Sequence, residues 1–367
     1  MSFAPADKLP LIRQLTDLSG AVEEMLLTGL TAASETTRQT LEVTFREASR
    51  LRLLRLASTL RGANEEIGRF VSRQGEFSGK RLSFFLNRAW LLAQGLLQAL
   101  QTGDEAALAR LMWVQPARPI ERLELVTLGV TKKVAQGSFC AFEFRLREVS
   151  GVHPSRLTWS CVFPLKPGNE IPAEGFLQLP QKQKFKTTVF LEGKTLTVTN
   201  VMVADDGFGG GRVTLTETST VTPGNPFTGW SQFHVWTPEP LKKRLREHQP
   251  GPFDLEVELQ DEIVLQDWSI QSPQAAVREG QITYPITSGA LCFDAVVSAA
   301  DDGAALRKAL DELKKLKTRP PLFGLLHFER ARFILQPLST LIETGPGLLT
   351  ISTDAINNKA LLKTLKF

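Results

Sequence analysis

Proline placement constrains this chain more than any other feature, because a proline inside a helix breaks or kinks it. No proline occurs between Leu11 and Val114, and the apolar residues of this stretch recur at helical spacing. Prolines then return at Pro116 and Pro119, where the apolar period changes from about 3.6 residues to about 2. The sequence therefore predicts a helical bundle over residues 1–114 and a β-rich region from residue 119 onward.

We expect one long amphipathic helix in this bundle, because the apolar residues from Leu41 to Val71 fall on a single stripe of a helical wheel. Ser34 offers an N-cap, and Glu35 places an acid near the positive end of the helix dipole. The other helices of the bundle are expected at Lys8–Leu18, Ala21–Leu30, Ser78–Leu100 and Glu105–Met112.

Residues 119–248 alternate apolar and polar side chains, a pattern that is typical of an antiparallel sheet with one solvated face. Strands are expected at Leu123–Thr131, Phe139–Arg147, Leu157–Phe163, Lys184–Leu191, Thr195–Val203 and Arg212–Val221. Near the end of this run, Arg212 and the threonines at 214, 216, 218, 220 and 222 share one face. We interpret residues 119–248 as an antiparallel β-rich domain.

A short basic helix over Leu241–Glu247 leads to Gln249-Pro250-Gly251-Pro252, which marks a second hinge. Residues 252–367 then predict an α+β domain, in which a helix with a leucine face follows Gly303 and ends before Pro320. The other elements expected are strands at Phe253–Leu259, Ile263–Ile270, Ile282–Ile286 and Leu291–Ser298, a closing hairpin of Leu322–Glu329 and Arg332–Ile342, and a last helix at Ala355–Leu365. The predicted fold class is α+β, with an N-terminal helical bundle followed by a mainly antiparallel β-rich region.

Composition and charge exclude several classes of protein. With 42% hydrophobic and 22% charged residues the chain has the profile of an ordinary folded protein, and its net charge of +4 is far from that of a histone-like protein. Cys140, Cys161 and Cys292 each lie in an apolar or aromatic stretch and are expected to be buried free thiols in a reducing compartment. Neither a secretion signal nor a membrane-spanning run is recognisable, so we expect a cytoplasmic protein.

Three short strings imitate known motifs. Gly193-Lys194-Thr195 has the tail of a phosphate-binding loop, but Thr188 stands where the motif needs a glycine and a strand pattern follows, so a hairpin turn is expected. Asp205–Gly211 is acidic and rich in glycine, which we interpret as a hairpin tip, with a mobile recognition loop as the alternative. Gly229–Phe233 imitates GxSxG, but Phe233 replaces the second glycine, which disfavours a hydrolase.

His234 lies in an aromatic cluster with Trp230 and Trp236, and these three residues are the candidate lining of a pocket. A histidine at the edge of an aromatic core is the alternative interpretation. No two histidines have the i, i+4 spacing of a helical metal site, and neither a metal nor a cofactor is expected. An enzyme built around His234 with Asp205 or Asp206 stays a third function class, because residues distant in sequence can converge without a local motif.

Lys182, Lys184 and Lys186 are the candidate nucleic-acid-binding residues. On a strand, the period of about 2 places all three on one face, where they could track phosphate groups. The alternative interpretation is that the lysines protect the edge of a sheet from unwanted pairing. Binding that falls steeply with salt would favour the first interpretation.

Basic residues also lie on two of the expected helices. Arg46, Arg50 and Arg61 cluster on the wheel of the long helix and are the candidate partner-binding residues, with a solvated face as the alternative. The helix after Gly303 surrounds its leucines with lysines and could lie on an anionic membrane. Its apolar face lacks an aromatic anchor, so packing on the sheet is expected and no membrane partner is predicted.

The stretches Ala33–Leu41, Phe45–Leu56 and Phe84–Leu92 resemble uncharacterised bacterial proteins that are encoded beside SWIM zinc-finger proteins, MoxR-type ATPases and von Willebrand factor A proteins. This chain itself has no zinc-finger spacing and no Walker motif. The resemblance therefore implies an accessory subunit whose partners, such as a MoxR-type ATPase or a SWIM zinc-finger protein, carry those activities.

Abundant packing signals and the lack of a catalytic motif together favour a non-catalytic adaptor that binds partner proteins in a multi-protein bacterial system. A nucleic-acid-binding module that uses Lys182, Lys184 and Lys186 is the alternative.

Overall fold

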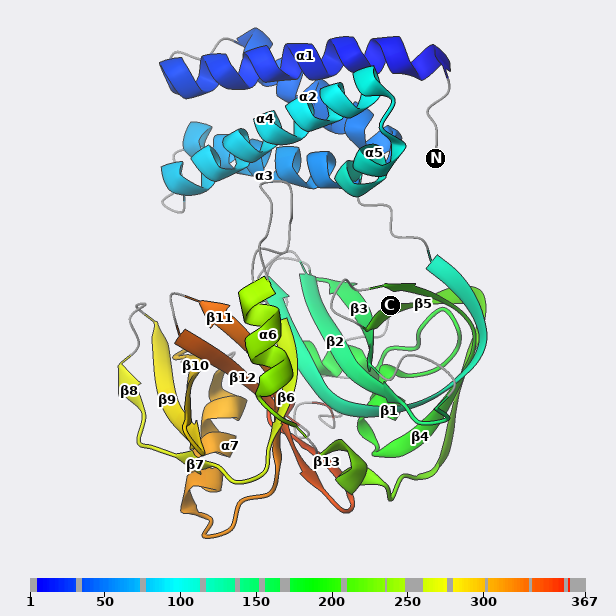
Figure 1. Ribbon diagram of the computed structural model, residues 1–367, viewed down its shortest axis with the longest axis vertical. Coiled ribbons are helices and arrows are strands. Elements are labelled where there is room, and N and C mark those ends of the chain that lie inside the picture. Colours follow the sequence, from blue (N-terminus) through cyan, green and yellow to red (C-terminus); the bar gives the residue numbers. More distant parts are fainter. Residues whose placement is uncertain are drawn as a thin grey trace. The chain divides into compact units, whose positions relative to one another are not determined.

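The computed structural model describes residues 5–30, 35–72, 77–112, 117–135, 139–151, 156–165, 172–205, 210–234, 236–247, 260–275, 280–300, 303–329, 332–352 and 356. They divide into two compact units: the first holds helices α1–α5, and the second holds two β-sheets with α6 and α7 (Figure 1). The predicted α+β fold class is confirmed. The finer division into three domains stays a prediction. Every helix within the described ranges is too short or too polar to cross a membrane.

The described part of the first unit is a bundle of five helices, α1 Pro5–Thr28, α2 Glu35–Arg50, α3 Leu54–Val71, α4 Gly79–Thr102 and α5 Glu105–Met112. Its core is made of the leucine and alanine stripes of these helices, as the periodicity predicts. α4 begins at Ser78, whose hydroxyl accepts a hydrogen bond from the Arg81 amide, and ends at Gly103, which has a φ of 71°. The predictions for α4 and α5 are confirmed.

The single long helix predicted from Leu41 to Val71 is wrong, because the chain turns between α2 and α3. The turn is a Schellman motif, in which the Leu53 amide donates to the Ala48 carbonyl at 2.8 Å and Arg52 takes a left-handed φ of 58°. Glycine is the usual residue at such a position. Because an arginine stands there instead, the sequence carries no signal for this turn.

The two short helices predicted at residues 8–18 and 21–30 are one continuous helix, α1. Gly20 lies inside it, at a cost of about 1 kcal/mol relative to alanine. The fully buried Leu18 and Val22 on either side offset that cost. The predicted N-cap Ser34 lies outside the described residues.

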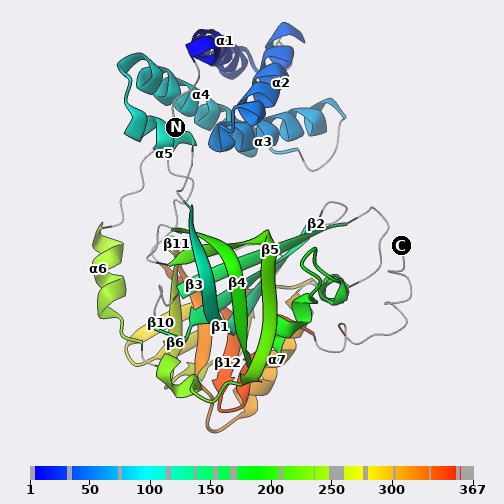
Figure 2. The same cartoon turned by 90° about the vertical axis from the view of Figure 1, so that its right-hand side faces the viewer.

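The second unit begins with a closed barrel in the order β1-β2-β3-β5-β4, formed by β1 Ala117–Ala135, β2 Phe139–Glu148, β3 Arg156–Pro164, β4 Lys194–Asp205 and β5 Gly211–Pro226 (Figure 2). Neighbouring strands are antiparallel except β3 and β5, which pair in parallel. Inward-facing aliphatic and aromatic side chains fill the interior. These strands confirm all but one of the strand predictions made within residues 119–248.

The strand predicted at Lys184–Leu191 is wrong. Residues 181–186 form a tight turn, in which the Gln181 amide donates to the Phe185 carbonyl at 2.7 Å. The 3-10 helix η2, Thr187–Leu191, follows directly, and a second one, η1 Ala173–Gln178, precedes the turn. Phe185 and Phe190 both reach the barrel core, although residues five apart on a strand would point to opposite faces.

The second sheet has the order β6-β11-β12-β10-β9-β7, with β13 beside β12 and β8 beside β9. Its strands are β6 Gln260–Leu265, β7 Ser269–Ile270, β8 Gln274–Ala275, β9 Gln281–Ser288, β10 Leu291–Ser298, β11 Leu322–Glu329, β12 Arg332–Ile342 and β13 Gly345–Leu348. The leucine face of α7, Ala304–Lys315, packs on this sheet as expected, and α6, Glu239–Glu247, adds Leu241 to the same core (Figure 1).

The predicted hairpin of β11 and β12 and the strands corresponding to β9 and β10 are confirmed, whereas the predicted strand 263–270 is divided into β6 and β7. The predicted strand 253–259 lies outside the described residues. So does the predicted helix 355–365, apart from Ile356.

The two sheets of the second unit pack together along β1. A Cβ added to Gly129 would lie 2.7 Å from the Leu338 Cβ, so only glycine permits this close approach. The hydroxyls of Ser339 and Thr350 donate to the carbonyls of Leu128 and Val130 in β1. Ile351 and Ile356, which follow the second sheet in the chain, are buried in the barrel core.

Candidate functional site

A groove of about 370 Å³ opens in the barrel wall between β3 and β5. The parallel pairing of these strands covers only Leu157–Trp159 against Gly211–Val213. Beyond those pairs each strand keeps its other neighbour, β2 for β3 and β4 for β5. Along the groove, the described edges of β3 and β5 are therefore not hydrogen-bonded to each other.

The floor of the groove is apolar. Side chains alternate across a strand, so Trp159 and Cys161 of β3 and Val213 of β5 point inward and line the bottom. Trp159 stacks on Phe190 with ring centroids 4.6 Å apart, which fixes its indole in the barrel core. Burial raises the pKa of the Cys161 thiol to about 12, so this floor carries no charge at neutral pH.

The turn at residues 181–186 forms the third wall of the groove. The Gln183 Nε2 donates to the Thr216 carbonyl of β5 at 2.9 Å, and the Gln181 Nε2 donates to the Thr187 hydroxyl at 3.0 Å. Phe185 anchors the turn from below, because it is buried among the aromatic rings of the barrel. The turn is thus held against β5 by a hydrogen bond and against the core by a ring.

The rim of the groove is polar and basic. Lys182, Lys184 and Lys186 are exposed on the turn, so the three predicted residues gather on one short segment, although no strand presents them. Lys182 lines the groove together with the exposed Arg212 of β5. Arg212 was not predicted as a site residue, because nothing in its local sequence shows that β5 passes beside this turn.

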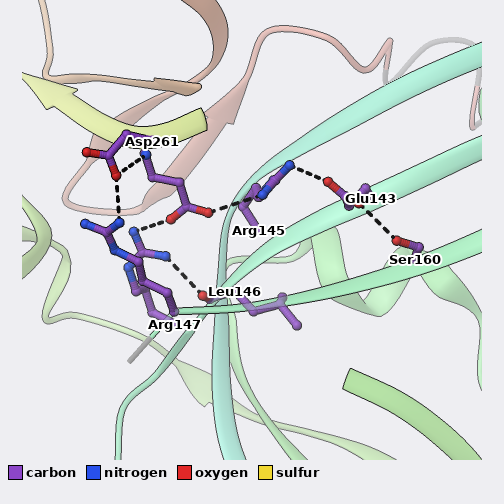
Figure 3. A network of polar contacts seen from close by, with 8 residues as sticks. Glu143, Arg145, Leu146, Arg147, Ser160 and Asp261 are labelled. Carbon is purple, nitrogen blue, oxygen red and sulfur yellow. Dashed lines mark hydrogen bonds and ion pairs between the residues drawn. The ribbon is translucent and has the colours of Figure 1, made fainter. Parts of the chain in front are cut away.

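A buried ionic network covers another side of the barrel (Figure 3). Glu262 of β6 pairs with Arg147 at 2.6 Å and with Arg145 at 3.6 Å, and Asp261 pairs with Arg156 at 2.8 Å. The side chains of Arg145, Arg147 and Glu262 are only 9%, 11% and 8% exposed. These side chains join β2 and β3 to the second sheet, so this outer face of the barrel is covered from solvent.

The network reaches the groove through one hydroxyl. Glu143 accepts a hydrogen bond from the Ser160 hydroxyl at 3.3 Å and pairs with Arg145 (Figure 3). Ser160 itself lies on the rim of the groove. The groove and the contact between the sheets are therefore connected through side chains of β2 and β3.

The candidate partner-binding arginines do not form one surface cluster on a single helix. Arg46 and Arg50 belong to α2, whereas Arg61 belongs to α3, because the chain turns between these helices. Each pairs within its own helix, with Glu42, Glu47 and Glu65 respectively. Their role in partner binding stays a prediction.

The aromatic cluster around His234 lies in the apolar layer between the two sheets. Trp230 is 1% exposed, and its indole N–H donates to the Phe227 carbonyl at 2.7 Å. The half-buried Trp236 packs against the same layer, and the His234 carbonyl accepts a hydrogen bond from Gln266 at 2.8 Å. A pocket at these residues stays a prediction, as does an enzyme that pairs His234 with Asp205 or Asp206; Asp206 lies outside the described residues.

The cysteines differ in burial. Cys140 and Cys161 are buried free thiols as predicted, but Cys292 is exposed on β10, because its neighbours Leu291 and Phe293 take the inner positions. Among the described residues no three His, Cys, Asp or Glu side chains gather as a metal site.

Similarity to known proteins is distant. No protein-family model matches this chain, and no curated protein does. Among solved structures, the Ifi202 HINa domain in complex with 20 bp double-stranded DNA is 12% identical with a TM-score of 0.28, over 60% of this chain and 94% of that chain. A replication protein A heterotrimer bound to single-stranded DNA is 10% identical with a TM-score of 0.25, over 69% of this chain and 52% of that chain. Scores this low carry no argument, so the site rests on its own geometry.

Proposed function

We propose that this chain binds nucleic acid through the groove between β3 and β5 and the basic turn beside it. The observation that carries the proposal is that Lys182 and Arg212 lie at the rim of a groove whose floor is apolar, with Lys184 and Lys186 exposed on the same turn. Basic side chains supply the sequence-independent attraction to phosphate groups, and an apolar floor suits the bases and sugars between them.

The barrel architecture is compatible with this role. Five strands that close into a barrel of mainly antiparallel pairs correspond to the OB-fold, which holds oligonucleotides or oligosaccharides on its surface in many proteins. A fold by itself does not define a function, so the proposal depends on the charged groups at the groove. Those groups favour a polyanion over a neutral sugar.

The adaptor function predicted from the sequence gains no support from the arginines of the helical unit, since Arg46, Arg50 and Arg61 are paired with acids one helical turn away. Exposed pairs of this kind contribute about 0–1 kcal/mol and leave little uncompensated charge for a partner. Partner binding by the helical unit remains the second hypothesis, and copurification from the native host tests it directly.

The test of nucleic-acid binding is a fluorescence anisotropy titration of a labelled oligonucleotide at several salt concentrations. Changing Lys182, Lys184 and Lys186 to glutamate is expected to weaken binding at least tenfold. Loss of three phosphate contacts would also reduce the slope of log affinity against log salt by about 2 for a single strand.

A matched control makes the same charge change elsewhere. Lys314 and Lys315 at the end of α7 and Lys317 just after it are exposed, and their change to glutamate alters the net charge of the protein equally. We expect this control to reduce affinity far less than the change on the turn. Equal losses in the two triple variants would mean that net charge alone attracts the oligonucleotide, and the proposed site would then be wrong.

A further inference from the structure

We infer that the groove receives an unpaired base, so that the protein selects single-stranded over double-stranded nucleic acid; this inference rests on the proposed function. The first observation is size. A volume of about 370 Å³ is at the lower end of the range of about 300–1,000 Å³ for small-molecule pockets, so the groove fits one planar group with its sugar and excludes a duplex.

The second observation is the distribution of polarity from floor to rim. Trp159, Val213 and Leu215 make the bottom of the groove apolar, whereas the charges of Lys182 and Arg212 lie at the exposed rim. A nucleotide has the same polarity, with a flat, weakly polar base at one end and a phosphate at the other. An acidic peptide would bring carboxylates on short side chains, for which an uncharged, apolar floor offers no partner.

The third observation is the supply of hydrogen-bonding groups between floor and rim. Gln181 and Gln183 line the groove, and each donates from its side-chain N–H₂ group to hold the turn, so the amide carbonyl oxygen remains as an acceptor. The edge of β3 after Trp159 adds backbone groups that are not paired with β5. Amide and backbone groups of this kind can bond to the edge of a base once it has left its Watson–Crick partner.

A duplex would have to release a base before it could use the groove, which costs a few kcal/mol for unstacking and unpairing. Single strands avoid that cost.

The experiment compares three labelled 20-mers of equal charge per strand in anisotropy titrations of the full chain: oligothymidine, an abasic oligomer with the same phosphates, and oligothymidine paired with its complement. We expect the abasic oligomer and the duplex to bind at least tenfold more weakly than oligothymidine. The salt slopes of oligothymidine and the abasic oligomer should agree, because both keep the phosphate contacts.

Thr214→Trp then tests the location. Thr214 is exposed and lines the groove, so an indole at this position fills the space. The variant should therefore bind oligothymidine and the abasic oligomer with the same affinity. Thr222→Trp is the matched control, because Thr222 is an exposed threonine on the same strand but outside the groove lining. This control should keep the difference.

Each outcome separates the inference from the proposed function. Equal affinity for oligothymidine and the abasic oligomer, with binding still abolished by the triple lysine change, would overturn base insertion and leave nucleic-acid binding in place. If Thr214→Trp leaves the difference in affinity between oligothymidine and the abasic oligomer unchanged, the base binds elsewhere, and this result would also overturn the inference. Failure to bind any of the three oligomers, or equally tight binding of a polyglutamate peptide, would overturn both.

Discussion

Removal of the Glu262 side chain should destabilise the second unit strongly, because it breaks a buried ion pair. Its carboxylate pairs with Arg147 at 2.6 Å and Arg145 at 3.6 Å, and all three groups are about nine-tenths buried. After Glu262→Ala, Arg145 retains Glu143, but Arg147 retains only the Leu146 carbonyl at 3.2 Å and the ring of Phe323 among its described contacts. One buried guanidinium then loses its counter-charge.

Removal of one partner from a buried ion pair costs about 3–5 kcal/mol. We expect about 3 kcal/mol for Glu262→Ala, at the lower end of that range, because Arg145 keeps a second carboxylate. Glu124→Ala is the matched control: Glu124 pairs with Arg122 at 2.7 Å on the same barrel, but the two side chains are 36% and 62% exposed. Such a surface pair contributes about 0.2–1 kcal/mol.

Hydrogen exchange measured by mass spectrometry in increasing urea resolves the effect by segment. Amides of β2 and β6 should lose protection equivalent to about 3 kcal/mol in Glu262→Ala. Amides of α1–α5 serve as an internal reference, because they belong to the other compact unit. A loss no larger than that of Glu124→Ala would show that the network contributes no more than a surface pair, and the reasoning from burial would be refuted.

Two further predictions concern stability. Glu66→Gln should lower the free energy of unfolding of the helical bundle by about 1–2 kcal/mol, because buried Glu66 accepts a hydrogen bond from the Ser78 amide at 3.0 Å and pairs with Arg81 at 2.9 Å. Burial alone would raise the pKa of Glu66, but this bond and the nearby guanidinium groups hold it below its ordinary value. The wild type should therefore be more stable than Glu66→Gln by the full amount above about pH 4.3, and this difference should vanish as the pH falls through the lowered pKa. Thermal unfolding followed by helical circular dichroism would detect the change. A difference in stability that does not depend on pH would contradict the role given to the Glu66 carboxylate. Gly129→Val should destabilise the second unit by about 2 kcal/mol or more, because the new Cβ would lie 2.7 Å from that of Leu338, and an unchanged urea midpoint would show that the sheets do not pack so closely.

Periodicity and capping residues predicted most of the elements, because these signals are local. Ser78 and Gly103 mark the two ends of α4 with the residue types that those positions favour. The turn at Arg52 was not predictable in this way, because a left-handed arginine replaces the expected glycine. Local signals thus fail where tertiary packing, here the burial of Leu53, imposes a conformation that the residue itself does not favour.

The candidate site was predictable only in part. Lys182, Lys184 and Lys186 were identified from their spacing, but the same spacing led to the wrong element, since a turn can alternate exposed and buried residues as a strand does. Arg212 and Thr214 were not identified as site residues, because the groove combines β3, β5 and a turn that are far apart in the sequence. The pairing of the strands and the hydrogen bond from Gln183 to Thr216 bring them together.

Residues that follow the second sheet in the chain are buried in the barrel core, and this has a consequence for synthesis on the ribosome. β5 completes the barrel strands at Pro226, yet Ile351 and Ile356 are part of the barrel core. At about 5–20 residues per second, these residues emerge roughly ten seconds after β5. During that interval the nascent barrel exposes apolar side chains that its own strands cannot cover, so the emerging chain needs protection from aggregation until the second sheet has also been made.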